Sequence, residues 1–304
     1  MAKKEDIEKY IKILQGKNSA NPLELKQSFL PDTLFKYRPI NKNTLDCLER
    51  GSIWVSSAES QNDPFDSSLF YNDNEFIDTF FRRATFKTDF FKNYGVEISD
   101  TEIKQIHLNS NPNQKFIELC KSKNINRDYD ILSSMKVRKS ETKKFIKKIK
   151  NEIKLSSFSE RNDSILMWSH YSDKHKGICI EYDFNNEDYI LNFLEPIYYT
   201  NQIISLSKAY GNSRYTGLIK VAAISKALDW QYEKEWRIVF PEPKPNSSGH
   251  FKVPKPKAIY LGTNHKENTP DNTSHCNKIE SLCKELNIPI FYMRLHNKEY
   301  KIVK

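Results

Sequence analysis

Short apolar stretches typical of β-strands lie on both sides of a long, highly charged stretch with a helical pattern. No regular strand–helix–strand alternation, which would indicate a parallel sheet, is visible. We therefore predict an α+β fold in which residues 1–304 form a single domain with a helical insert at about residues 75–153. Strands are predicted at residues 34–39, 53–56, 155–159, 177–182, 194–199, 235–240, 258–261 and 290–294, and helices at residues 5–14, 44–50, 165–171, 218–227 and 277–286.

The composition is that of a globular protein without a membrane partner. Hydrophobic residues make up 38% of the chain and aromatic residues 12%, which is enough to build a core. No stretch approaches the ~18 apolar residues that cross a bilayer, and residues 1–17 lack the apolar core of a signal peptide. The five cysteines include no CxxC pair, which is typical of reduced thiols. We therefore expect a cytoplasmic protein, and the sequence predicts no oligomeric state.

Two common kinds of site are not indicated. The chain has only 8 glycines and no GxGxxG or GxxxxGK[ST] string, so the standard glycine-rich phosphate loops are excluded. His275, Cys276 and Cys283 are close in sequence, but no fourth zinc ligand accompanies them. A helix with buried thiols is the favoured interpretation, and we predict no bound metal.

The net charge of +9 is concentrated in one segment. Residues 136–154 contain nine Lys or Arg and two Glu, and apolar residues recur there every four positions, which predicts an amphipathic helix with a basic outer face. Such a face is often only solvated, but it is also one that binds polyanions. Lys143, Lys144, Lys147 and Lys148 are the residues through which we would expect contact with nucleic acid.

Polar side chains with catalytic potential lie on three predicted strands. Arg38 follows an apolar-aromatic run, Ser157 and Ser159 share a face at period two, and Glu233 and Glu235 have the same spacing. An arginine binds a diphosphate through two parallel hydrogen bonds, and serine hydroxyls fix a ribose or an amide. A carboxylate stabilises the oxocarbenium-like carbon that forms when a glycosidic bond breaks, and a second carboxylate activates the acceptor.

Two further groups complete the predicted site. Trp168 and Tyr171 share a helix face, on which they could stack against a nicotinamide ring, and His170 would lie near the scissile bond. Asn62 and Asp63, in a turn-rich cluster, are assigned to cofactor binding. Each candidate also has a structural explanation: a turn for the cluster, core packing for the aromatic pair, a solvated strand end for the glutamates, and for Arg38 an ion pair with Asp63 or Asp66.

The sequence resembles the bacterial family catalogued as domain of unknown function 2971. The resemblance rests on residues 34–66, with Tyr-Arg-Pro and Asn-Asp-Pro-Phe-Asp, and on residues 155–183, with Ser-Phe-Ser and Met-Trp-Ser-His-Tyr. Residues 233–237 (Glu-Lys-Glu-Trp-Arg) and the Leu-Gly pair at 261–262 complete it. This resemblance implies no particular activity.

A more distant resemblance is to the Arg-Ser-Glu ADP-ribosyltransferases, whose three motifs occur here in the same order. It implies a fold of antiparallel sheets around a cleft and NAD as co-substrate. Arg38 would hold the diphosphate, with Tyr37 beside it among the cofactor-binding residues, and Ser157 would brace the nicotinamide ribose. Glu235 would be the catalytic carboxylate and Glu233 would orient the acceptor. Phe158 departs from the family pattern, which has threonine there, and the insert between the first two motifs is long.

The leading hypothesis is therefore an enzyme that cleaves NAD and transfers ADP-ribose to an acceptor that the sequence does not specify. The first alternative is a basic nucleic-acid-binding effector module without catalysis. The second is a metal-dependent nuclease that uses Asp63, Asp66, His170 and Glu181. These residue types can bind a metal ion, but their spacing is not that of a known metal site. The enzyme hypothesis requires the arginine, serine and glutamate motifs to meet in space.

Overall fold

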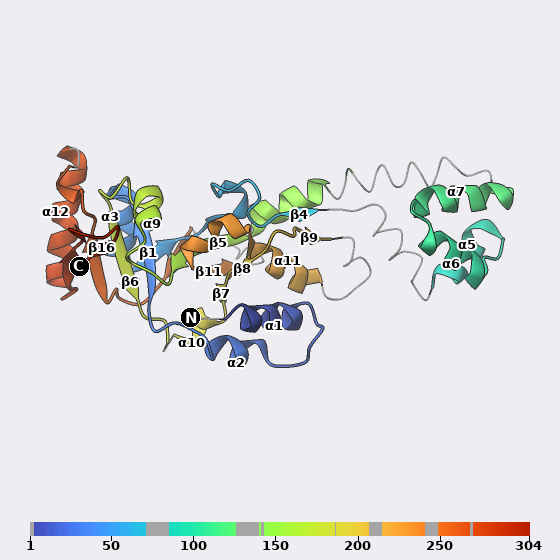
Figure 1. The fold of residues 1–304 in the computed structure, drawn as a ribbon, viewed down its shortest axis with the longest axis horizontal. Coiled ribbons are helices and arrows are strands. Elements are labelled where there is room, and N and C mark those ends of the chain that lie inside the picture. Colours follow the sequence, from blue (N-terminus) through green and yellow to red (C-terminus); the bar gives the residue numbers. More distant parts are fainter. Residues whose placement is uncertain are drawn as a thin grey trace.

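One mixed sheet forms the centre of the molecule (Figure 1). The structure is a computed structural model, and it describes residues 3–70, 85–125, 140, 143–185, 187–206, 215–240, 249–267 and 270–304. The sheet has the order β14-β13-β6-β1-β5-β11-β7, with β3 also paired to β5. Its strands are β1 (Leu34–Arg38), β3 (Ser56–Ser57), β5 (Lys154–Ser159), β6 (Ile178–Tyr182), β7 (Leu194–Pro196), β11 (Glu235–Phe240), β13 (Ala258–Leu261) and β14 (Ile290–Tyr292). The predicted α+β class is confirmed.

The sheet opens between β1 and β5. β1 pairs with β6 over its whole length, but it pairs with β5 only at Phe35 opposite Ser159. The other end of β5 pairs with β3, through Ser56 opposite Leu155. No strand of the described chain pairs with the stretch of β5 between these contacts on that side, so an opening is left in the sheet at this point.

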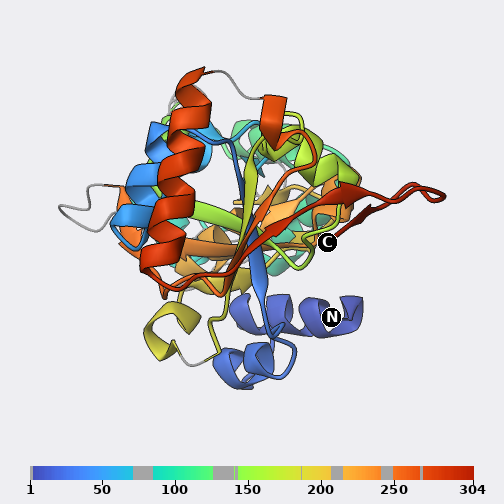
Figure 2. The same ribbon diagram turned by 90° about the vertical axis from the view of Figure 1, so that its left-hand side faces the viewer.

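Helices cover both faces of the sheet around β1, a strand in the middle of the sheet order. On one face, Leu34 of β1 shares a core with residues of α3 (Lys42–Glu49) and α12 (Pro270–Glu285), which lie side by side in Figure 2. On the other face, Phe35 and Tyr37 pack with Met167 and Trp168 of α9 (Ile165–Tyr171). Side chains on a strand alternate between faces, so Lys36 shares the face of Leu34.

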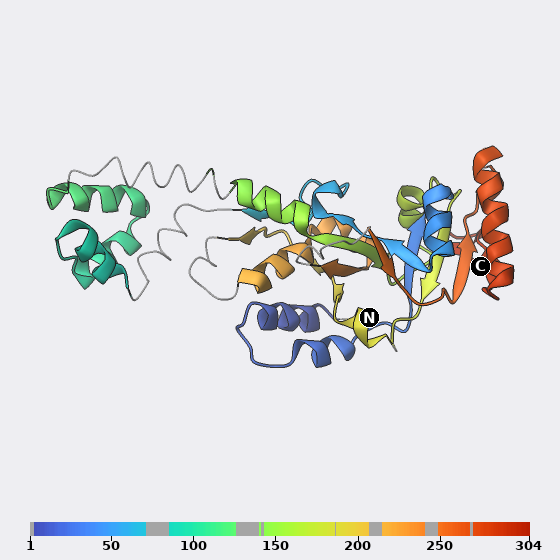
Figure 3. The ribbon, with the colours of Figure 1, turned by 180° about the vertical axis from the view of Figure 1, so that it is seen from behind.

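The N-terminal helices α1 (Lys4–Leu14) and α2 (Pro22–Gln27) pack together along one edge of the molecule (Figure 3). A buried glutamate, Glu195 of β7, holds them to the sheet. Its carboxylate accepts from Lys26 at 3.2 Å, from Lys220 of α11 (Tyr215–Ala223) at 2.6 Å, and from the hydroxyl of Tyr10. Three donors satisfy this one buried carboxylate, as burial of a charge requires.

The part of the predicted insert that the structure describes is helical. α5 (Phe86–Tyr94), α6 (Asp100–Leu108) and α7 (Pro112–Ser122) enclose a hydrophobic cluster of their own, which includes Phe86, Phe90 and Phe116. A further helix at residues 143–152 buries Ile149 against the main core. Residues 75–84, 126–139, 141 and 142 of the predicted insert lie outside the described residues, and the single-domain assignment stays a prediction.

The remaining elements are short. They are β2 (Ser52–Trp54), η1 (Ala58–Ser60), β4 (Leu69–Phe70), α10 (Asp188–Leu191), β8 (Tyr198–Tyr199), β9 (Ile204–Ser205), β10 (Ser225–Lys226), η3 (Leu228–Glu233), β12 (His250–Lys252), η4 (His265–Glu267), β15 (Arg294–Leu295) and β16 (Ile302–Val303). Among the described helices, none combines the length and the hydrophobicity that crossing a membrane requires.

Candidate functional site

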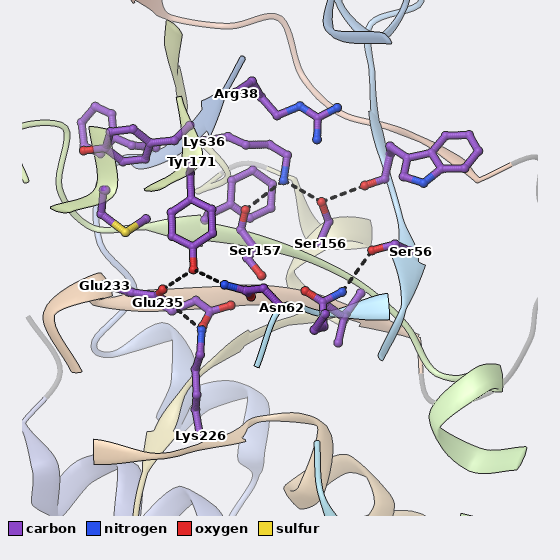
Figure 4. A pocket seen from close by; sticks show the side chains of 17 residues that line it. Lys36, Arg38, Ser56, Asn62, Ser156, Ser157, Tyr171, Lys226, Glu233 and Glu235 are labelled. Atoms are coloured by element: carbon purple, nitrogen blue, oxygen red, sulfur yellow. Dashed lines mark hydrogen bonds and ion pairs between the residues drawn. The ribbon is translucent and has the colours of Figure 1, made fainter. Parts of the chain in front are cut away.

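A cavity of about 190 Å³ lies at the opening between β1 and β5 (Figure 4). Its walls come from β1, β5 and α9, from β2, β3 and the turn after η1, and from β10, the end of η3 and the start of β11. The lining residues are Phe35, Lys36, Tyr37, Arg38, Trp54, Ser56, Gln61, Asn62, Leu155, Ser156, Ser157, Phe158, Met167, Tyr171, Lys226, Glu233 and Glu235. The arginine, serine and glutamate motifs therefore meet in one place. In sequence, Arg38 and Ser157 are 119 residues apart, and Ser157 and Glu233 are 76 residues apart.

One wall of the cavity carries two buried carboxylates. Glu233 ends the 3-10 helix η3, Lys234 is left-handed with φ 48°, and Glu235 begins β11. The expectation that both glutamates lie on one strand face was therefore wrong, because the chain turns at Lys234. The two side chains still converge, since Lys226 donates to Glu233 at 2.5 Å and to Glu235 at 2.9 Å.

Behind this wall, Arg237 joins β11 to the turn that contains Asp66. Its guanidinium makes two parallel hydrogen bonds to the Asp66 carboxylate, at 2.7 and 2.6 Å, and its Nε donates to Glu235 at 2.7 Å. Arg237 is fully buried, and Asp66 and Glu235 are buried with it. The Asn-Asp-Pro-Phe-Asp motif thus anchors the strand that bears Glu235, and Arg38 does not pair with Asp66.

The two carboxylates differ in their affinity for protons. Burial alone would raise the pKa of Glu235, but Arg237 and Lys226 hold it well below its usual range. Burial and repulsion from Glu235 raise the pKa of Glu233 despite its contact with Lys226. Glu235 therefore stays ionised, and Glu233 is the member of the pair that takes up a proton first as the pH falls.

The opposite wall is cationic (Figure 4). The ammonium of Lys36 crosses the opening in the sheet and donates to the hydroxyl of Ser156 at 2.8 Å and to the carbonyl of Ser157 at 2.9 Å. Burial, reinforced by the positive charge of Arg38, lowers the pKa of Lys36 to about 7. Arg38 is half-buried, and within the described chain its guanidinium makes no hydrogen bond or ion pair.

Hydrogen bonds connect the remaining predicted residues to the acidic wall. The hydroxyl of Tyr171 donates to Glu233 at 2.6 Å, and the side-chain amide of Asn62 donates to the Tyr171 hydroxyl at 3.3 Å. The Ser157 hydroxyl also helps to lower the pKa of Glu235, and both residues line the cavity. Tyr37 lines the cavity with its ring, while its hydroxyl donates to the carbonyl of Arg161 at 2.8 Å.

Four residues of the predicted site do not line the cavity. Ser159 is buried and donates to the carbonyl of Glu233 at 2.6 Å. Trp168 is fully buried in the core, where its indole donates to the carbonyl of Asn162. His170 is exposed and contacts the hydroxyl of Tyr232, and Asp63 accepts from the backbone N–H of Phe65 within the turn. Their contacts are those of structural residues, so they are not part of the site that we retain.

The residues considered for metal binding are also separate. Asp66 is bound by Arg237, His170 by Tyr232, and Glu181 accepts from the hydroxyl of Tyr260 at 2.6 Å. In the described part of the chain, no three His, Cys, Asp or Glu side chains are grouped so as to hold a metal ion. Cys276 and Cys283 of α12 pack into the hydrophobic core.

Three basic residues of the site, Lys36, Lys226 and Arg237, were not predicted from the sequence. Lys226 and Arg237 pair with the glutamates, and Lys36 lies on the opposite wall. A signal was present for two of them, since Lys36 and Arg237 each interrupt an apolar strand pattern, where a charge requires a partner. Lys226 lies within the helix predicted at residues 218–227, where a charged residue is common, and gave no such signal; in the structure it belongs to β10.

The comparisons with known proteins support one of the two resemblances. The model of the family described as "Protein of unknown function (DUF2971)" matches residues 167–238. This match supports the resemblance to that family. The matched segment contains Tyr171, Lys226, Glu233, Glu235 and Arg237, so the acidic wall and its cations lie within it. No curated protein and no solved structure matches the chain significantly.

Proposed function

We propose that this chain is an enzyme that cleaves the N-glycosidic bond of NAD and transfers ADP-ribose, in the manner of the ADP-ribosyltransferases. The observation that carries the proposal is the meeting of Arg38, Ser157, Glu233 and Glu235 at one cavity. These residues come from β1, β5, η3 and β11. The resemblance to the ADP-ribosyltransferases assigns all of them to the binding and cleavage of NAD.

The charges of the cavity suit the two ends of NAD. The nicotinamide riboside end is cationic and fits the wall that carries Glu233 and Glu235, and the diphosphate is anionic and fits the wall that carries Arg38. At about 190 Å³ the cavity is smaller than the roughly 300–1,000 Å³ of a site that encloses a drug-sized ligand. It therefore takes the nicotinamide and its ribose, and the adenosine lies outside it.

In the proposed reaction the bond between ribose C1′ and the nicotinamide nitrogen breaks, and its electron pair leaves with neutral nicotinamide. The permanently ionised Glu235 stabilises the oxocarbenium ion at C1′, with the Ser157 hydroxyl at its side. An acceptor oxygen, of water or of a macromolecule, then bonds to C1′ and gives its proton to Glu233, whose raised pKa makes it the better base of the two.

The test is the release of nicotinamide from NAD labelled in the ring, measured with the purified protein alone and with cell lysate as a source of acceptors. Because Arg38 makes no ion pair in the described chain, Arg38→Met is expected to fold normally and to lower kcat/KM about 10- to 100-fold, as loss of a charged hydrogen-bond donor does. Arg50→Met, the same substitution at an exposed arginine, is the matched control.

If the unmodified protein releases no nicotinamide above the level of heated protein, or if both arginine variants behave alike, the proposal is wrong. Label that remains on protein or nucleic acid would identify the class of acceptor.

Nucleic-acid binding is a second proposed function, and one observation favours it. Lys143, Lys144, Lys147 and Lys148 are all exposed on the outer face of the helix at residues 143–152, while Ile149 is buried beneath it. Replacing the four lysines by glutamine is expected to remove most of the affinity for duplex DNA or RNA at low salt, and to reduce the salt dependence of binding. Gel-shift titrations at two salt concentrations measure this, and no binding at low salt by the unmodified protein would rule the function out.

A further inference from the structure

Lys36 stands out among the buried cations of this chain. The described residues include four buried cationic side chains, Lys26, Lys36, Lys226 and Arg237. Lys26 pairs with Glu195, Lys226 with Glu233 and Glu235, and Arg237 with Asp66 and Glu235. Lys36 has only a hydroxyl and a backbone carbonyl as acceptors. An ammonium buried without a counter-ion costs several kcal/mol, so its retention in a structural role alone would be unfavourable.

The surroundings of Lys36 point to a counter-ion that comes from outside the chain. Its ammonium lies at the wall of the cavity, 4.9 Å from the ring centre of Phe158, and not in closed core. Arg38, two residues further along β1, lines the same cavity and likewise has no carboxylate partner in the described chain. Two positive charges that repel each other and face one space are both stabilised when an anion enters it.

We propose that Lys36 and Arg38 together bind the diphosphate of the substrate, with Lys36 as a second cationic ligand beside the arginine. The two side chains suit this division, because a guanidinium grips two oxygens of one phosphate as a planar fork and an ammonium acts as a compact point charge. The acidic wall opposite fixes the direction of the ligand, since an anion placed against Glu233 and Glu235 would be repelled. This inference deepens the proposed function and rests on it for the identity of the ligand.

The site has a consequence for the pH dependence of binding. The groups that act on Lys36 are Arg38 of β1, Glu235 of β11 and Cys47 of α3. Arg237 and Lys226 hold the pKa of Glu235 well below its usual range, so its carboxylate keeps its charge near neutral pH. Burial raises the pKa of the Cys47 thiol, so the thiol stays neutral. Lys36, with a pKa of about 7, is therefore the group that changes charge. Above that pH a diphosphate must draw a proton onto Lys36 as it binds, and its affinity falls as the pH rises.

The experiment measures the binding of ADP-ribose by calorimetry, at about pH 6.5 and about pH 8.5. ADP-ribose is chosen because both of its phosphates are diesters and do not titrate in this range. Lys36→Met keeps the length of the side chain and removes the charge, and Lys36→Gln keeps a donor toward Ser157. Lys104→Met, at an exposed lysine of α6, is the matched control for a change of one charge. Nicotinamide riboside, which has no diphosphate, is the control ligand.

Lys36→Met and Lys36→Gln are each expected to weaken the binding of ADP-ribose about 10- to 100-fold at the lower pH and to remove most of its pH dependence. Binding of nicotinamide riboside should not change. The inference is overturned if the unmodified protein does not bind ADP-ribose, or if both Lys36 variants bind it as tightly as the Lys104 variant.

The outcome is separable from that of the proposed function. Binding of ADP-ribose that depends on Lys36, in a protein that releases no nicotinamide from NAD, would support the diphosphate site and reject the reaction. Release of nicotinamide by a protein whose ADP-ribose affinity is unaffected by Lys36→Met would do the reverse.

Discussion

Arg237→Met is expected to destabilise the folded protein by about 3–5 kcal/mol, a large share of the 5–15 kcal/mol that a typical domain has. The substitution leaves the carboxylates of Asp66 and Glu235 buried, with Asp66 deprived of the guanidinium that makes two hydrogen bonds to it. Urea denaturation followed by circular dichroism measures the loss. Arg50→Met, which removes an exposed pair with Asp46, is the control and should have little effect on stability, because solvent screens exposed ion pairs.

The same measurement has an expected pH dependence. Since Arg237 and Lys226 hold the pKa of Glu235 below its usual value, their contribution to stability is fully present above the ordinary pKa of 4.5 and is lost as the pH falls below it. The difference between the unmodified protein and the Arg237 variant should therefore shrink on acidification. A variant within about 1 kcal/mol of the unmodified protein at neutral pH would contradict the role given to this arginine.

Glu235→Gln is expected to lower the rate of nicotinamide release about 100- to 1,000-fold, the usual effect of removing one group that stabilises transition-state charge. Glutamine keeps the shape of the side chain but has no negative charge to place beside the oxocarbenium ion. Some stability is also lost, because Lys226 and Arg237 each lose a contact, although Arg237 keeps Asp66 and Lys226 keeps Glu233. The rate must therefore be expressed per folded molecule.

The chain offers a matched control for this second variant. Glu195 is also buried and also bound by two basic side chains, Lys26 and Lys220, but it does not line the cavity. Glu195→Gln should therefore cost stability by the same mechanism and leave nicotinamide release by the folded fraction unchanged. Equal losses of rate in both variants would show that Glu235 acts only through the fold.

The local elements were predictable from sequence, and the partners of buried charges were not. β1, β5 and β11 were predicted in the right places because each is a short stretch of strand length that contains apolar and aromatic residues. Glu233 was assigned to the strand of Glu235 because the period-two pattern continues through Lys234, and only the left-handed backbone of Lys234 breaks it. The helix of Trp168 was correctly placed, but spacing alone does not distinguish the face that meets the core from the face that meets the cavity.

The convergence of the motifs depends on strand order, which the sequence did not specify. Ser157 lies opposite Arg237 because β5 runs antiparallel to β11 in that register. Asp66 and Arg237 form an ion pair although they are 171 residues apart in sequence, and nothing in the sequence around either residue predicts its partner. Long-range ion pairs of this kind form through tertiary packing, which period and propensity do not encode.

The coupling of Glu235 to Arg237 and Lys226 also bears on how such a chain changes in evolution. A substitution that silences the acidic wall removes part of the network that keeps the protein folded, so selection for abundance alone would tend to preserve Glu235. Arg38 has no such second duty in the described chain, and losing it should leave a stable protein. If the proposed reaction is correct, descendants that lose it but persist as folded proteins are expected to diverge first along β1, while the residues of the acidic wall are kept for stability.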